Sequence, residues 1–113
     1  MICVRFLEKP AIHESNFFRS GKTVKEGGTL KISCKASGKP EPLVKWWKMV
    51  PRTVDDDKEI QLSEAYEEAE LRIENAQIGK RKGTRMDTGL YKCAAENVAG
   101  KDVKDTAIQV ACK

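Results

Sequence analysis

The chain has 113 residues, with 21 Lys and Arg against 17 Asp and Glu, and a formal net charge of +4. This length is that of a single domain, and no apolar run approaches the ~18 residues that would cross a bilayer, so we expect no membrane insertion. With only four cysteines and one histidine, His13, the chain has few side chains that could bind a metal or form a Ser/His or Cys/His catalytic pair. We therefore expect a binding module rather than an enzyme, with no cofactor and no metal.

The first clear strand pattern lies in residues 29–36. Leu30, Ile32 and Cys34 fall on one face of this segment and polar side chains on the other, as in a half-buried strand. Residues 37–42 hold two prolines and a glycine. Because proline cannot donate to a ladder, we expect a loop there.

Further strands are expected at residues 44–48, 71–73, 89–96 and 102–110, with a hairpin turn at 97–100. Residues 63–70 are rich in Glu and Ala, and their propensity alone favours a helix. A segment this short is unstable as an isolated helix and is flanked by strands, so we expect no helix there. Regularly spaced short strands predict an all-β sandwich.

A set of residues at characteristic spacings makes the fold more specific. Its members are Cys34, Trp46 twelve residues later, Leu71-x-Ile73, Asp87-x-Gly89-x-Tyr91-x-Cys93 and Asn97-x-x-Gly100. The pattern resembles the immunoglobulin superfamily, most closely its intermediate (I) set, over residues 10–111. This resemblance implies an antiparallel Greek-key sandwich of two sheets. Residues 1–9 would then be an N-terminal arm and residues 10–113 a single Ig-like domain.

The resemblance also implies structural roles. Cys34 and Cys93 would form a disulfide between the sheets, with Trp46 packed against it. Tyr91 would be a tyrosine corner, with its hydroxyl bonded to the backbone. Asp87 matches a family aspartate that pairs with a basic residue at the bottom of the fold, although the sequence does not identify that residue.

Leu71 and Ile73 would belong to the structural core. Trp47 would point away from it, since neighbouring residues of a strand face opposite sides. There it would either cover the hydrophobic flank of the sheet, which we favour, or contact a protein partner, because exposed tryptophans are enriched in binding hot spots.

Cys3 and Cys112 lie near the chain ends, outside the family pattern. A terminal disulfide between them would be useful only in an oxidising compartment, so it favours an extracellular protein. The last strand would end at the opposite pole from the start of the first, so residues 1–9 would have to fold back to reach Cys112. Otherwise one or both cysteines would pair with another chain or stay free.

The spacing between Ile73 and Asp87 is fourteen residues, where the family normally has about seven. The extra segment, residues 79–85, carries a cluster of four basic side chains: Lys80, Arg81, Lys82 and Arg85. Such clusters resemble glycosaminoglycan-binding sites, because many screened contacts to a polyanion add up without fixed geometry. Heparan sulfate is therefore a candidate ligand, and a solvated loop that limits aggregation is the alternative.

Four lysines could extend a positive surface next to this loop: Lys22, Lys25, Lys31 and Lys35. Nucleic acid is not expected as the polyanion, because no aromatic stacking platform interleaves with the lysines. The acidic run Asp55-Asp56-Asp57-Lys58-Glu59 could resemble a calcium site, but it lacks the glycine and the terminal bidentate glutamate of a calcium loop, so we expect no calcium site.

The sequence thus predicts an extracellular Ig-like binding module, secreted or part of an ectodomain, that recognises a protein such as a receptor or an adhesion molecule. Heparan sulfate binding through the inserted loop would assist it. The alternative is an intracellular structural Ig domain of a muscle or cytoskeletal protein, whose cysteines stay reduced.

Overall fold

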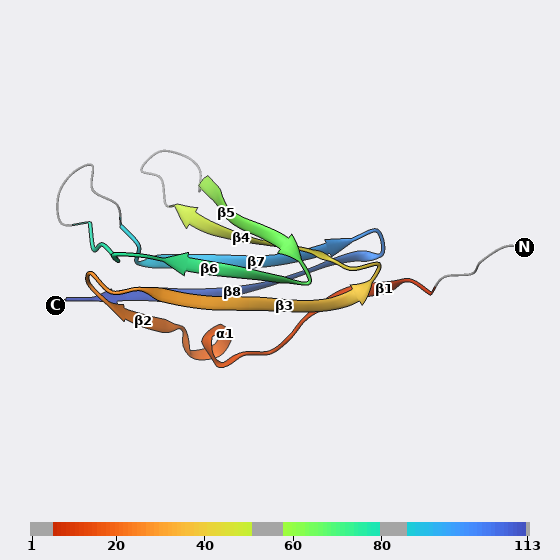
Figure 1. The fold of residues 1–113 in the computed structure, drawn as a ribbon, viewed down its shortest axis with the longest axis horizontal. Helices are drawn as coiled ribbons and strands as arrows, with labels where there is room; N and C mark the ends of the chain where they lie inside the picture. The colour runs from red at the N-terminus through yellow and green to blue at the C-terminus, as the bar shows by residue number, and fades with distance from the viewer. Residues whose placement is uncertain (1–5, 51–57, 80–85, 113) are drawn as a thin grey trace, which may run out of the picture.

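The computed structural model describes residues 6–50, 58–79 and 86–112, which form two facing sheets and one short helix (Figure 1). One sheet has the strand order β1-β3-β6 and the other the order β2-β8-β7-β4-β5. The elements are β1 (Glu8–Ile12), α1 (Asn16–Ser20), β2 (Lys22–Lys25), β3 (Leu30–Lys39), β4 (Leu43–Val50), β5 (Lys58–Tyr66), β6 (Glu68–Ile73), β7 (Gly89–Asn97) and β8 (Gly100–Ala111). The expected all-β sandwich is confirmed.

The core lies between the two sheets and follows from the alternation of each strand. In β6 the even positions are exposed, whereas Ala69, Leu71 and Ile73 are buried. β3 lies antiparallel to β6, with Leu30 opposite Ile73 and Cys34 opposite Ala69, so the buried rows of the two strands meet. Because a one-residue slip would turn each buried row to solvent, this pattern fixes the register.

The expectation of strands without a helix is wrong at one place. α1 is a helix of five residues whose Phe17 and Phe18 pack against the core. Both rings lie 6.4 Å from the Trp46 ring, measured between centroids. A helix this short has no stability of its own, so this tertiary packing holds it in place.

The expected loop at residues 37–42 is shorter than predicted. β3 continues to Lys39, because β1 pairs with it there: Glu8 lies opposite Lys39 and Ala11 opposite Ser37. β1 also begins two residues before the start expected for the domain.

The glutamate-rich residues 63–70 form no helix, as expected. They form the end of β5, a turn at Glu67 and the start of β6.

The chain changes sheets between β1 and β2, and β8 anchors this crossover. The Asp102 carboxylate accepts a 2.7 Å hydrogen bond from the backbone N–H of Ile12. Glu14 binds the Lys104 ammonium and lies 3.6 Å from the Arg19 guanidinium. Hydrogen bonding to Lys104, and then the charges of Lys104 and Arg19, lower the pKa of Glu14 below its usual value.

Candidate protein-binding face

Tyr91, assigned to the tyrosine corner, and Asp87, matched to the family aspartate, lie together at one end of the core. The Tyr91 hydroxyl donates a 2.6 Å hydrogen bond to the backbone carbonyl of Asp87. The Asp87 carboxylate accepts a 2.8 Å bond from the N–H of Gln77. Both Tyr91 and Asp87 are buried, so these bonds satisfy groups that would otherwise be costly to remove from water.

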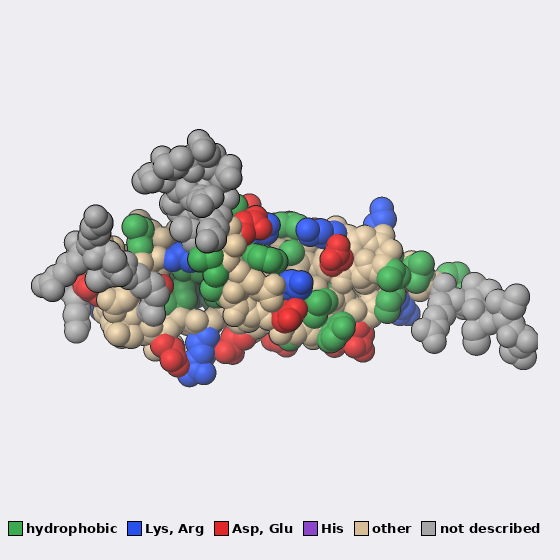
Figure 2. Space-filling model, turned by 90° about the horizontal axis from the view of Figure 1, so that it is seen from above, with side chains coloured by type: hydrophobic (Ala, Val, Ile, Leu, Met, Phe, Trp, Pro, Cys, Tyr) green, Lys and Arg blue, Asp and Glu red, His purple; other side chains and the backbone are tan. Residues whose placement is uncertain are grey.

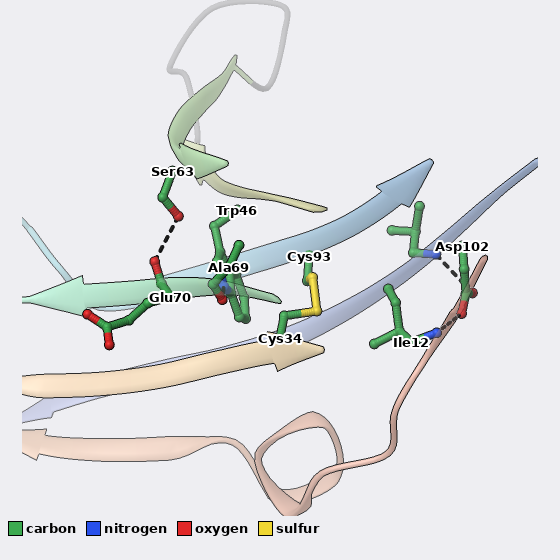
Figure 3. Close-up of a disulfide and its surroundings, with 9 residues drawn as sticks. Ile12, Cys34, Trp46, Ser63, Ala69, Glu70, Cys93 and Asp102 are labelled. Carbon is green, nitrogen blue, oxygen red and sulfur yellow. Dashed lines mark hydrogen bonds between the residues drawn. A yellow bond between two sulfur atoms is a disulfide. The ribbon is translucent and has the colours of Figure 1, made fainter. Parts of the chain in front are cut away.

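Trp46 is fully buried at the centre of the sandwich, where it contacts the other sheet. Its indole N–H donates a 2.9 Å hydrogen bond to the carbonyl of Ala69 (Figure 3). A disulfide between Cys34 and Cys93 joins the two sheets beside it, with 6.5 Å between the two Cα atoms. Both sulfurs belong to fully buried residues. This bridge matches the one that the family pattern implies.

The second expected pairing, of Cys3 with Cys112, is not formed in the structure. Cys112 is an exposed free cysteine just after β8, at one pole of the sandwich. β1 lies near the opposite pole (Figure 1). Cys3 is outside the described residues. The terminal disulfide therefore no longer supports an extracellular location.

Trp47 occupies the outer face of the five-stranded sheet, as the alternation predicts. It is partly exposed and lies opposite Lys92 of β7 and Gln61 of β5. The Lys92 ammonium lies 5.9 Å from the centroid of the Trp47 ring, within the range of a cation–π contact. The same ammonium forms a 2.6 Å ion pair with Glu59. The indole is thus held in place on the sheet while part of its surface stays accessible.

Apolar side chains from three strands surround Trp47 on this outer face. Strand pairing brings them together: Met49 lies opposite Leu90, and Ala94 lies opposite Val103. Leu90 and Val103 are each 42% exposed. We call this surface the Trp47 face, and its members are Leu43, Lys45, Trp47, Met49, Leu90, Lys92, Ala94 and Val103.

Charged residues on the Trp47 face and its border are paired within the sheet. Lys45 lies 3.9 Å from Glu64 on the neighbouring strand, and Lys92 is held by Glu59. Asp105 lies directly opposite Lys92 on β8. An apolar centre with mixed charges around it is the usual composition of a protein-binding patch.

The inserted basic cluster cannot be placed, because Lys80, Arg81, Lys82 and Arg85 lie outside the described residues. The two ends of the insertion are described: Ile78 and Met86 form an isolated antiparallel bridge. Gly79 adopts a φ of 69°, and a Cβ there would lie 2.9 Å from the Cβ of Met86.

The four lysines proposed to extend the cluster divide between two surfaces. Lys22 and Lys25 belong to β2, which pairs with the end of β8. Lys31 and Lys35 lie on the outer side of the three-stranded sheet, opposite Arg72 and Glu68.

In the described ranges, the structure has no helix long and apolar enough to cross a membrane. The same ranges hold no group of three or more His, Cys, Asp or Glu side chains that could bind a metal ion. Asp55, Asp56 and Asp57 of the acidic run are outside these ranges, whereas its Glu59 lies in β5 and pairs with Lys92.

The fold and the bridged core define an immunoglobulin-like domain. Residues 17–110 match the family model of the immunoglobulin I-set domain. The chain therefore belongs to the immunoglobulin I-set family.

Relatives among curated proteins include an adhesion molecule and a membrane protein. Human (Homo sapiens) cell adhesion molecule 1 is 29% identical over 109 residues, which cover 94% of this chain and 22% of that protein. Limbic system-associated membrane protein of Gallus gallus is 36% identical over 89 residues, covering 78% of this chain and 22% of that protein. The chain thus spans only about a fifth of these relatives.

Solved structures of Ig domains confirm the fold. The N-terminal four Ig domains of Dscam1 isoform 4.44 superpose with a TM-score of 0.68 at 16% identity, covering 97% of this chain and 27% of that one. An I-band fragment of titin gives 0.64 at 26% identity, covering 94% and 34%.

Proposed function

We propose that this chain is a recognition domain of an extracellular protein and that it binds another protein through the Trp47 face. The observation that carries the proposal is the partly exposed Trp47, fixed by Lys92 within an apolar patch. Aromatic residues that are already ordered lose little conformational entropy on binding, which makes them effective anchors. The domain acts by recognition rather than by chemistry.

Two observations favour the extracellular setting over the intracellular structural alternative. The relatives above include an adhesion molecule and a membrane protein. The Cys34–Cys93 disulfide forms and persists in oxidising compartments. Alkylation of the denatured protein from its native source, before and after reduction, separates the two settings. We expect Cys34 and Cys93 to react only after reduction. Labelling of both before reduction would favour the intracellular alternative.

Binding is tested with immobilised domain and solubilised membranes of its native tissue, followed by quantitative mass spectrometry of the retained proteins. Leu90→Ser and Val103→Ser change exposed apolar residues of the Trp47 face. Val98→Ser is the matched control, because Val98 is 80% exposed in the β7–β8 turn, outside the face. We expect a set of proteins retained by the wild type and by Val98→Ser and depleted in both face variants. Equal retention by all four would refute the proposed face.

Heparan sulfate binding stays a prediction from the sequence. It rests on Lys80, Arg81, Lys82 and Arg85, whose substitution together by Ala should lower the salt concentration at which the domain elutes from heparin. A variant with Lys31 and Lys35 replaced by Ala controls for general loss of positive charge. If the cluster variant eluted with the wild type, this site would be excluded.

A further inference from the structure

β6 is the edge strand of the three-stranded sheet. It pairs with β3 on one side, and no strand in the described part of the chain pairs with its other side. The corresponding sheet of a constant-type immunoglobulin domain has four strands, so a sandwich of this kind can accommodate one more. An unpaired edge exposes backbone groups that can pair with another chain.

The hydrogen bonding of β6 shows which backbone groups face this free edge. The carbonyl of Glu70 accepts a 2.8 Å hydrogen bond from the Ser63 hydroxyl of β5, which lies on the side away from β3 (Figure 3). Backbone groups of an antiparallel strand alternate between its two sides. The N–H and C=O of Arg72, two residues further on, therefore also face the free edge, as does the N–H of Glu70.

A groove of about 440 Å³ runs beside this edge; its exposed lining is mostly apolar but also includes the charged Lys48, Glu74 and Asp87. Ile60 and Leu62 line it from β5 and are 44% and 43% exposed. Leu71 and Ile73 line it from β6. A strand added to β6 would direct every second side chain toward this groove. Figure 2, which views the molecule from the β5 side, shows hydrophobic side chains among charged ones there.

The charge of the edge indicates the chemistry of the occupant. Residues 67–74 hold four glutamates, Glu67, Glu68, Glu70 and Glu74, and a single basic residue, Arg72. Arg72 forms a 2.9 Å ion pair with Glu74. Outward side chains of an added strand would lie beside Glu68 and Glu70, and opposite charges in such cross-strand positions are stabilising. A second copy of β6 would bring its own glutamates to the same row, which is unfavourable.

We propose that the free edge of β6 accepts an extended segment of a protein partner in which apolar and basic residues alternate. Backbone hydrogen bonds to Glu70 and Arg72 hold the segment, its apolar side chains enter the groove beside Ile60 and Leu62, and its basic side chains meet the glutamates. β6, which would hold the segment, is in the other sheet from the Trp47 face, and Ile60 and Leu62 of β5 are not members of that face. Either proposal can therefore fail without the other.

The test measures binding of a fluorescent peptide with alternating Lys and Val residues to the domain by anisotropy. Arg72→Pro removes the edge-facing N–H and Arg72→Ala keeps it, while both remove the same charge. We expect Arg72→Pro to weaken binding by about tenfold, the effect of losing one backbone hydrogen bond at the edge. Arg72→Ala should bind as tightly as the wild type or more tightly.

Leu62→Lys provides a second arm if Arg72→Pro fails to fold, which its thermal melt would reveal. This variant places a positive charge in the groove and should weaken binding by about tenfold or more, whereas Val98→Lys should leave it unchanged. Equal affinities for Leu62→Lys and Val98→Lys would overturn the proposal. So would equal binding of a peptide with Glu in place of Lys, or a wild-type dimer in sedimentation that Leu62→Lys dissociates, since a second copy would then occupy the edge.

Discussion

Removal of the Cys34–Cys93 bridge should destabilise the domain strongly. The two cysteines are 59 residues apart in sequence. In the chain-entropy model, closing a loop of that length lowers the entropy of the unfolded chain enough to stabilise the fold by about 4 kcal/mol. Small domains have net stabilities of about 5–15 kcal/mol, so this one bond accounts for a large share. The perturbation is the double substitution Cys34→Ala with Cys93→Ala.

Urea unfolding followed by tryptophan fluorescence measures this loss, because Trp46 is buried beside the bridge. With a denaturant slope of about 1.5 kcal/mol/M, the midpoint should fall by roughly 3 M. Both proteins carry Cys112→Ser, which prevents disulfide exchange through the exposed thiol. A midpoint shift below about 0.5 M at an unchanged slope would refute the reasoning, since the bridge would then not constrain the unfolded chain.

Three further substitutions test local features. Tyr91→Phe removes the hydroxyl that donates to the buried carbonyl of Asp87 and should lower the free energy of unfolding in urea by about 2 kcal/mol. A change near zero would contradict the role of this hydrogen bond in the tyrosine corner. Glu14→Gln should lower the melting temperature at pH 7 but not at acid pH. The lowered pKa of Glu14 in the folded state stabilises the fold above the unfolded pKa, and this stability is lost as the pH falls through the folded pKa. A pH-independent difference in melting temperature would count against the pairing with Lys104. Gly21→Ala should destabilise the domain by at least about 1 kcal/mol, because Gly21 has a φ of 74° and a Cβ there would lie 2.6 Å from a carbonyl oxygen of β8. An unchanged unfolding midpoint would exclude that clash.

The core was predictable from the sequence because its signal is local. Cys34, Tyr91 and Cys93 lie in strands whose alternation defines an inner face, and their spacings match one family. The family spacing placed Trp46 inside, and alternation along the strand then placed Trp47 outside. The contact of Trp47 with Lys92 depends on the register between two strands distant in sequence, which alternation within one strand does not specify.

Other features required the three-dimensional arrangement. The two phenylalanines of α1 have no helical period to reveal them, because five residues make little more than one turn. The extension of β3 into the proline-containing segment depends on its pairing with β1. The free edge of β6 follows from the strand order, and the groove beside its acidic row depends on how Ile60 and Leu62 of β5 lie against β6.

The central claim is that the Trp47 face binds a protein, and partner capture by Leu90→Ser compared with Val98→Ser tests it most directly. Both variants replace an exposed aliphatic side chain by the same polar one, so general loss of surface hydrophobicity is matched. We predict that Leu90→Ser loses the proteins that the wild type and Val98→Ser retain. Undiminished capture by a folded Leu90→Ser domain would contradict the account.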